Sequence, residues 1–205
     1  MPTNFSEITR LDAVAVRHSV ELVHAATGDD WSRPTPCSEW RLRDLVAHMT
    51  AQHHGFAAAA RGQGEDLRRW EVHPLGDDAI AQYTEAADEV LAAFAAVEDA
   101  EAELALPEFT TGRTFPAQLA IGFHLIDYLV HSWDVAVTLG IPFNPDPELV
   151  RVGLPIALAV PAGPNRLEPG SPFRPALGME DGAGAMDRIL TVLGRSPERS
   201  SFTDA

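Results

Sequence analysis

The sequence predicts an all-α fold with four long helices followed by a smaller C-terminal part. Apolar residues recur at spacings of three and four over several long segments, which is the period of one helix face. Glycines and prolines end these segments, and no convincing alternation of apolar and polar residues predicts a strand. With 205 residues, of which 45% are hydrophobic, the chain is long enough to bury a core.

The pattern predicts six helices along the chain. They are expected at about 7–26, 40–61, 77–98, 116–139, 146–160 and 185–193. In the first helix, Leu11 and Leu22 belong to one apolar face, and a glycine follows its end. In the second helix, Leu45 and Met49 share a face. Between these two helices, prolines and polar turn formers predict an ordered loop over 29–40.

The third and fourth helices carry the clearest patterns. In the third, apolar residues from Ile80 to Val97 follow alternating spacings of three and four, a heptad-like seam suited to helix packing. The fourth begins at Pro116, where a missing N–H costs little, and Gly140 ends it. Between the two short helices that follow, 161–184 is rich in proline and glycine and predicts an arm along the surface.

The composition excludes several classes of protein. A single cysteine, Cys37, rules out a disulfide framework and a thiolate-based structural zinc site. The 15 basic residues, all arginine, against 30 acidic ones give a formal net charge of −15, which disfavours nucleic-acid binding. No segment approaches the roughly 18 apolar residues of a membrane span. The first residues lack the basic-then-apolar order of a signal peptide, so we expect a cytoplasmic protein.

A polar stripe runs along the fourth predicted helix, beside its apolar seam. It consists of His124, Asp127, His131 and Asp134. Because one residue corresponds to a rotation of about 100°, this stripe flanks the buried seam and lies partly between the helices. Asp127 and His131 are four residues apart, so their side chains meet on adjacent turns and can bind one divalent ion.

A third metal ligand has to come from another helix, because two ligands seldom hold a metal alone. The candidate is His48, at the edge of the apolar face of the second predicted helix. Two imidazoles and one carboxylate leave positions open for water or substrate, which is typical of a catalytic metal site. The same residues also have a structural interpretation, with His48 as a hydrogen-bonded core residue and Asp127 as the group that orients His131.

The neighbouring polar residues are more readily explained as structural. His53 and His54 are expected on a solvated helix face, and for His124 a structural role is favoured over that of an extra ligand or a partner of one. Asp134 could accept an N–H from the neighbouring histidine or cap a helix. Cys37 lies in a loop bounded by prolines, close to the start of the second helix, where a helix N-terminus could activate its thiol.

Three blocks of the sequence resemble a known family. They are TPCSEWRLRDLVAHMTAQHHGFAAAARG (35–62), DYLVHSWDVAVTLG (127–140) and SPFRPALGMEDGAGAMDRILTVLGRSPE (171–198). The first two resemble the mycothiol-dependent maleylpyruvate isomerase N-terminal domain, a branch of the DinB-like metal-binding bundles. The third resembles the tail of an actinobacterial subgroup of that family. The blocks follow the family's order over most of the chain.

The resemblance implies a DinB-like four-helix bundle with a divalent metal, zinc or nickel, at its open end. Carried over position by position, the metal ligands are His48, Asp127 and His131. The resemblance also implies a metal-binding bundle over 1–145 and, over 146–205, a helical extension and arm packed on that bundle. The family member best known as an enzyme has Glu at the position of Asp127 and carries a further C-terminal domain.

For function, the resemblance implies activation of a low-molecular-weight thiol. The thiolate is the nucleophile, and a divalent ion that binds sulfur favours it. We therefore expect a metal-dependent thiol S-transferase or a cis–trans isomerase that uses mycothiol and a small electrophile. The alternatives are a hydrolase that activates water, a non-catalytic metal-binding regulator and an iron oxygenase with two histidines and one carboxylate. The arm rich in proline and glycine could wrap its own bundle or a partner subunit, and the second alternative would give a homodimer.

Overall fold

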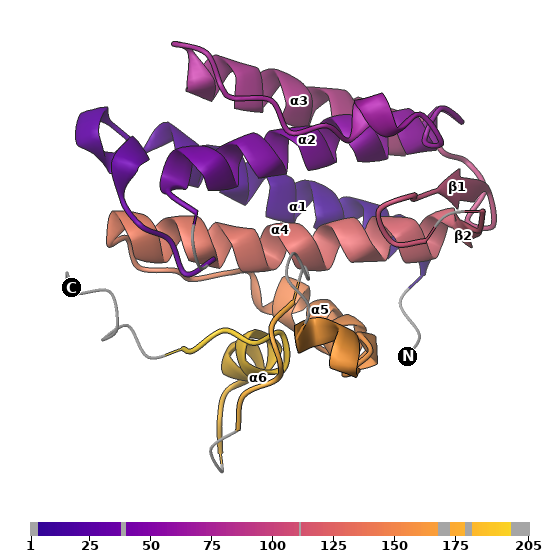
Figure 1. Ribbon diagram of the computed structural model, residues 1–205. Helices are drawn as coiled ribbons and strands as arrows, with labels where there is room; N and C mark the ends of the chain where they lie inside the picture. Colours follow the sequence, from indigo (N-terminus) through magenta and orange to yellow (C-terminus); the bar gives the residue numbers. More distant parts are fainter. Residues whose placement is uncertain (1–3, 38–39, 111, 168–172, 179–181, 198–205) are drawn as a thin grey trace. The chain divides into compact units, whose positions relative to one another are not determined.

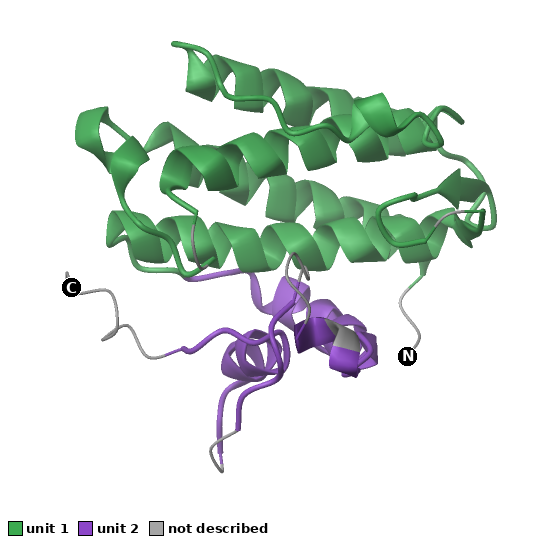
Figure 2. Ribbon diagram, viewed as in Figure 1, with its two compact units in different colours: residues 1–143 green, residues 144–205 purple. Residues whose placement is uncertain are grey.

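The computed structural model describes residues 4–37, 40–110, 112–167, 173–178 and 182–197. Helices account for most of these residues, which confirms the predicted all-α class. The chain divides into two compact units, residues 1–143 and 144–205 (Figure 2). None of the described helices is both long enough and apolar enough to cross a membrane.

Four long helices build the first unit (Figure 1). They are α1 Phe5–His24, α2 Leu42–Ala60, α3 Ala79–Ala95 and α4 Ala117–Leu139. Helix α1 packs against α4 and α3, and α2 packs against α3 and α4. All four begin and end within about three residues of the bounds that the apolar pattern predicts, as expected where helix signals are long and periodic.

Local hydrogen bonds fix the ends of these helices. Asn4 caps α1, where its side chain accepts a hydrogen bond of 2.8 Å from the backbone N–H of Glu7. At the start of α2, the Asp44 carboxylate accepts one of 3.0 Å from the backbone N–H of Arg41. Helix α4 ends at Gly140, whose φ of 70° is the left-handed conformation that glycine adopts without strain.

The core of the first unit consists of large side chains from all four helices. Those that are almost completely buried include Leu11, Leu42, Leu45, Met49, Phe56, Tyr83, Phe94, Ile121, Leu125, Tyr128 and Leu129. The segment after α2 also packs closely on that helix, because a Cβ at Gly55 would lie 2.2 Å from the ring of Trp70. The indole N–H of Trp70 donates a hydrogen bond of 2.9 Å to the carbonyl of Gly64. Glycine at position 55 is therefore a packing requirement.

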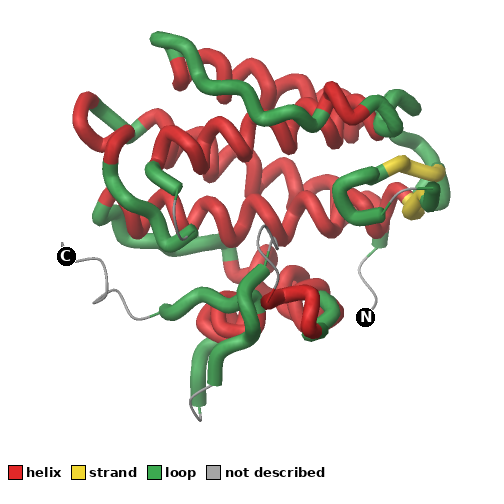
Figure 3. Tube along the Cα trace, viewed as in Figure 1, coloured by secondary structure: helices red, strands yellow, loops and turns green. Residues whose placement is uncertain are grey.

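A two-stranded antiparallel β-ladder lies between α3 and α4, which the sequence pattern does not predict. Strand β1 (Glu103–Ala105) pairs with β2 (Thr114–Pro116), and Leu104 lies opposite Phe115. Figure 3 shows both strands at one end of the long helices. Strands of three residues are too short to produce a visible alternation of apolar and polar residues. The ladder anchors both ends of the segment between its strands.

The second unit contains two shorter helices that pack against each other. They are α5 Pro147–Ala159 and α6 Ala185–Val192. The buried guanidinium of Arg166 joins separate parts of this unit. It donates hydrogen bonds to the carbonyl oxygens of Val160 at 3.1 Å, Pro161 at 2.9 Å and Val192 at 2.6 Å. One arginine can satisfy several carbonyl groups at once because its five N–H donors form a fork.

Candidate metal centre

Two neighbouring helices carry the candidate metal ligands, with His48 on α2 and both Asp127 and His131 on α4. The structure brings the three side chains together, and one donor atom from each lies within 4.8 Å of the other two. The ring centroids of His48 and His131 are 5.5 Å apart. On α4, Nε2 of His131 lies 3.4 Å from Oδ1 of Asp127, as the spacing of four residues predicts.

Asp134 sets the orientation of the His131 ring. Its Oδ2 lies 2.9 Å from Nδ1 of His131, and the Asp134 side chain is completely buried. With Nδ1 engaged in this way, Nε2 is the ring atom that faces Asp127. A carboxylate commonly holds the tautomer and rotation of a histidine that binds metal through its other nitrogen. Contact with this histidine is one of the two roles that the sequence suggests for Asp134.

The loop before α2 brings a thiol to the same carboxylate. The half-buried Cys37 has its Sγ 3.1 Å from Oδ2 of Asp134 and 3.8 Å from Nδ1 of His131. These three residues form a second group whose donor atoms lie within 4.8 Å of one another. Because the members already hydrogen-bond to one another, we interpret this group as a satisfied network on the Nδ1 side of the His131 ring.

The charge of His131 depends on two opposing effects. Burial disfavours the charged ring and acts to lower its pKa. The charge of Asp127 and the hydrogen bonds to Asp134 and Cys37 outweigh burial and hold the pKa of His131 well above its usual value. The surroundings of the ring therefore attract positive charge. A divalent ion would compete with the proton, because an imidazole must be neutral to bind metal.

One side of the three candidate ligands is accessible to solvent. The Asp127 side chain is 27% exposed, whereas that of His131 is only 6% exposed. Trp40 is 37% exposed, and its ring centroid lies 4.8 Å from that of His48. An ion held by two imidazoles and one carboxylate would thus have positions open to water or a small molecule on the side of Asp127.

His124 and His53 belong instead to a chain of buried polar groups, which we call the buried chain. Nδ1 of His124 lies 2.7 Å from Oδ1 of Asp12, and Nε2 of His124 lies 3.2 Å from Nδ1 of His53. All three residues are at most 1% exposed. The prediction of a solvated face is therefore wrong for His53, because α3 and α4 both pack on α2. It is confirmed for His54, which is exposed and lies 2.7 Å from Glu89.

Burial shifts the pKa values of two members of the buried chain. It raises the pKa of Asp12 in spite of the opposing charge of His124, and it lowers the pKa of His53 far below the usual value. The His53 ring stacks on Tyr128 with centroids 4.1 Å apart, and its Nε2 has no hydrogen-bond partner among the described residues. Because every member is buried, this chain lacks the access to solvent that a ligand site needs.

A polar pair one helical turn beyond His48 does not emerge from the sequence analysis. Gln52, one turn after His48 on α2, donates a hydrogen bond of 2.6 Å from Nε2 to Oε2 of Glu108. Glu108 comes from the segment between β1 and β2, and burial together with the charge of Asp127 raises its pKa. The spacing of four residues from His48 is a signal that identifies Gln52. No signal in the sequence places Glu108 beside it.

A family model and two protein sequences are similar to this chain. The family model described as the mycothiol maleylpyruvate isomerase N-terminal domain matches residues 13–136. The uncharacterised proteins MT0763 and Rv0738 of Mycobacterium tuberculosis are each 32% identical to the chain over 173 residues, which is 82% of the chain and 86% of each relative.

Two crystal structures of mycothiol-dependent maleylpyruvate isomerase are also similar, and one of them is a histidine-to-alanine mutant. The TM-scores are 0.57 for the mutant and 0.54 for the other structure, at sequence identities of 14% and 16%. Each match covers 76% of the chain and 68% of the solved chain. At this level of identity, the similarity shows a shared fold.

Proposed function

The chain belongs to the mycothiol maleylpyruvate isomerase N-terminal domain family, and from this premise we propose that it binds a divalent metal ion and activates a low-molecular-weight thiol. The thiol would be mycothiol. The reaction would be an S-transfer to a small electrophile, or a cis–trans isomerisation by addition and elimination of the thiol. The observation that supports this proposal most directly is the convergence of His48, Asp127 and His131.

The donor set fits a divalent ion such as zinc or nickel, with zinc expected first. Two imidazoles and one carboxylate are ligands that both metals accept. His131 is held by Asp134 with its Nε2 toward Asp127, so its metal-binding atom is oriented before any ion arrives. Preorganisation of this kind raises metal affinity, because the ring loses little freedom when it binds the ion.

The chemistry requires a nucleophilic sulfur, and a divalent ion would lower the pKa of a thiol that binds it, so that the thiolate forms near neutral pH. Cys37 is the single cysteine of the chain, and its thiol donates to Asp134. We therefore assign the reactive sulfur to a bound small thiol. The thiol and the electrophile would approach from the exposed side of Asp127, while Trp40 shields the ring of His48.

The metal content of matched histidine variants tests the site. His48 and His54 both lie on α2, but His54 is exposed and pairs with Glu89. We expect the wild-type protein and His54→Ala to retain stoichiometric zinc or nickel after dialysis, and His48→Ala to retain less than about a tenth as much. Elemental analysis and calorimetric titration measure this difference. Full metal content in His48→Ala would refute the proposed ligand set.

Activity assays separate the thiol-dependent reaction from its two main alternatives. The metal-loaded protein is incubated with a panel of electrophiles, with and without mycothiol. Products that form only with the thiol support the proposal. Hydrolysis that added thiol leaves unchanged would indicate that the protein activates water. Stoichiometric metal binding with neither activity would indicate a regulatory protein.

A further inference from the structure

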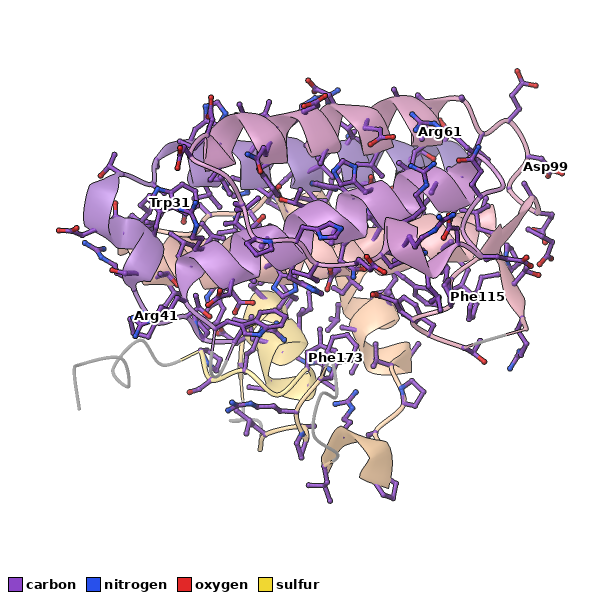
Figure 4. All side chains as sticks on the ribbon, turned by 45° about the horizontal axis from the view of Figure 1, so that its top comes forward. Trp31, Arg41, Arg61, Asp99, Phe115 and Phe173 are labelled. Atoms are coloured by element: carbon purple, nitrogen blue, oxygen red, sulfur yellow. The ribbon has the colours of Figure 1, made fainter. Side chains whose placement is uncertain are left out.

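The segment just before α2 folds back on itself, and we call its residues 33–37 and 40–41 the strap. Pro34 pairs with Arg41 in an isolated antiparallel bridge, which closes the strap at the start of α2. Figure 4 shows Arg41 and Phe115 toward opposite ends of the first unit. The strap therefore lies toward the end of this unit that is remote from the β-ladder.

Thr35 ties the two halves of the strap together. Thr35 is 1% exposed, and its Oγ1 donates a hydrogen bond of 3.0 Å to the carbonyl of Trp40. The same Oγ1 accepts a hydrogen bond of 3.1 Å from the backbone N–H of Cys37. The backbone N–H of Thr35 also donates to the Trp40 carbonyl, at 3.0 Å. One buried hydroxyl therefore fixes the position of Cys37 relative to Trp40.

The strap reaches both candidate histidine ligands, although these belong to different helices. The ring centroid of Trp40 lies 4.8 Å from that of His48 on α2. Sγ of Cys37 lies 3.1 Å from Oδ2 of Asp134, and this carboxylate engages Nδ1 of His131 on α4. Both contacts originate from the two residues that the buried hydroxyl holds together.

Trp40 depends on its backbone for its position. It is 37% exposed, whereas Trp70 is 3% and Trp133 is 6% exposed. Close packing on all sides fixes the two buried rings, but a partly exposed ring has fewer neighbours and depends more on the backbone that carries it. The two hydrogen bonds to the Trp40 carbonyl are therefore important for the contact with His48.

We propose that Thr35 is a positioning residue for the candidate metal centre, because its hydroxyl holds the strap against both histidine ligands. The inference rests on the proposed function, since the two rings act as ligands only if the protein binds a metal ion. Without the hydroxyl, the N–H of Cys37 would lose its acceptor and the carbonyl of Trp40 would lose one of two donors. Unsatisfied groups in a partly buried position are costly, so the strap would shift and both rings would lose their defined orientation.

Histidine resonances of the metal-free protein test this link without any ion. Thr35→Val removes the hydroxyl and keeps the shape of the side chain. We expect it to shift the ring nitrogen resonances of both His48 and His131 in ¹H–¹⁵N spectra. The matched control is Thr84→Val, because Oγ1 of Thr84 donates to a carbonyl within α3 at 2.8 Å and lies 3.0 Å from Nε2 of His24. The control should shift the ring of His24 and leave the two candidate ligands unchanged.

Zinc affinity tests the consequence for metal binding, as measured by competition with a chromogenic chelator. Thr35→Val should weaken zinc binding about three- to tenfold, less than the loss of a residue that touches a ligand directly. Thr35→Ser retains the hydroxyl and should recover an affinity within about twofold of the wild-type value. Thr84→Val should bind zinc as the wild-type protein does. Equal affinities of Thr35→Val and the wild-type protein, or no recovery in Thr35→Ser, would overturn the inference.

Trp40→Ala tests the same link while leaving the buried hydroxyl in place. It should shift the His48 ring and weaken zinc binding, and its effect combined with Thr35→Val should be smaller than the product of the two single effects. Two fully independent effects would show that Thr35 does not act through Trp40. If Thr35→Val does not fold, Trp40→Ala still decides, because an unchanged His48 ring with unchanged zinc affinity would overturn the inference.

The outcomes separate this inference from the proposed function. Ring shifts as expected in a protein that binds no zinc would refute the proposed metal site and leave the role of Thr35 in orienting the two histidines standing. Stoichiometric zinc binding, with rings and affinity unchanged in Thr35→Val and Trp40→Ala, would refute the role of Thr35 and leave the proposed metal site standing.

Discussion

The four long helices contain two groups of histidine and carboxylate side chains that differ mainly in access to solvent. In the buried chain, Asp12, His124 and His53 are fully enclosed, and burial raises the pKa of Asp12 and lowers that of His53. In the candidate metal centre, Asp127 is partly exposed and its charge raises the pKa of His131. The same pairs of residue types are therefore fully buried in one place and partly accessible to solvent in the other. Spacing identifies such pairs, and accessibility separates their roles.

The largest expected effect of a substitution falls on the buried chain. Asp12→Ala would leave Nδ1 of His124 without its partner in a fully buried position. We expect the free energy of unfolding to fall by about 3–5 kcal/mol. Asp127→Ala removes a partly exposed carboxylate and should change the free energy of unfolding by less than about 1 kcal/mol. Denaturant unfolding followed by circular dichroism measures both, and the opposite ranking would break the comparison.

An intermediate effect is expected for the residue that orients the candidate metal ligand. Asp134→Ala removes the acceptor from Nδ1 of His131, so the ring loses its preferred rotation and tautomer. Affinity for zinc should fall about 10- to 100-fold, as measured by competition with a chromogenic chelator. Asp134→Asn retains an oxygen acceptor and should recover part of this loss. If both variants bound zinc as tightly as the wild-type protein, Asp134 would not act through His131.

The smallest expected effect is the dependence of stability on pH that the buried chain causes. The folded protein keeps His53 neutral, because burial holds its pKa far below the usual value. The unfolded chain binds a proton at this histidine near pH 6.5. Below about pH 6.5 the unfolded state therefore gains a proton that the folded state does not, and the free energy of unfolding falls by up to about 1.4 kcal/mol per pH unit. At higher pH both states are neutral at this residue, and the contribution vanishes.

His53→Phe isolates this contribution from other titrating groups. The groups that face His53 are His124 and Tyr128 on α4 and Tyr83 on α3. Denaturant unfolding at about pH 7.5 and about pH 5.5 should show that the wild-type protein loses more stability on acidification than the variant does. Equal losses in the two proteins would mean that His53 is not kept neutral by the fold.

The helices could be predicted from the sequence because their signals are local. Apolar periodicity locates each helix. At the ends of the pattern, the Asn4 side chain accepts a hydrogen bond from a backbone N–H of α1, and Gly140 terminates α4. The β-ladder could not be predicted, because three-residue strands depend on pairing between segments rather than on a pattern within one segment.

The candidate site could be predicted only in part, for a similar reason. The pairing of Asp127 with His131 follows from their spacing on one helix. The burial of His53 depends on how α3 and α4 pack on α2, which the spacing of its neighbours does not reveal. The approach of Cys37 and Glu108 depends on the course of two loops, and loop conformation has no periodic signal in the sequence.

The segment between β1 and β2 and the two helices that carry the candidate metal ligands differ in how well they tolerate mutation. Glu108 and Phe109 lie in a surface loop whose two ends are clamped by paired strands, whereas the candidate metal ligands lie on two long helices. Loops tolerate replacements and changes of length far better than helix interiors do. After a gene duplication, mutations confined to this loop would change the surface beside the two helices while the spacing of the candidate metal ligands stayed intact.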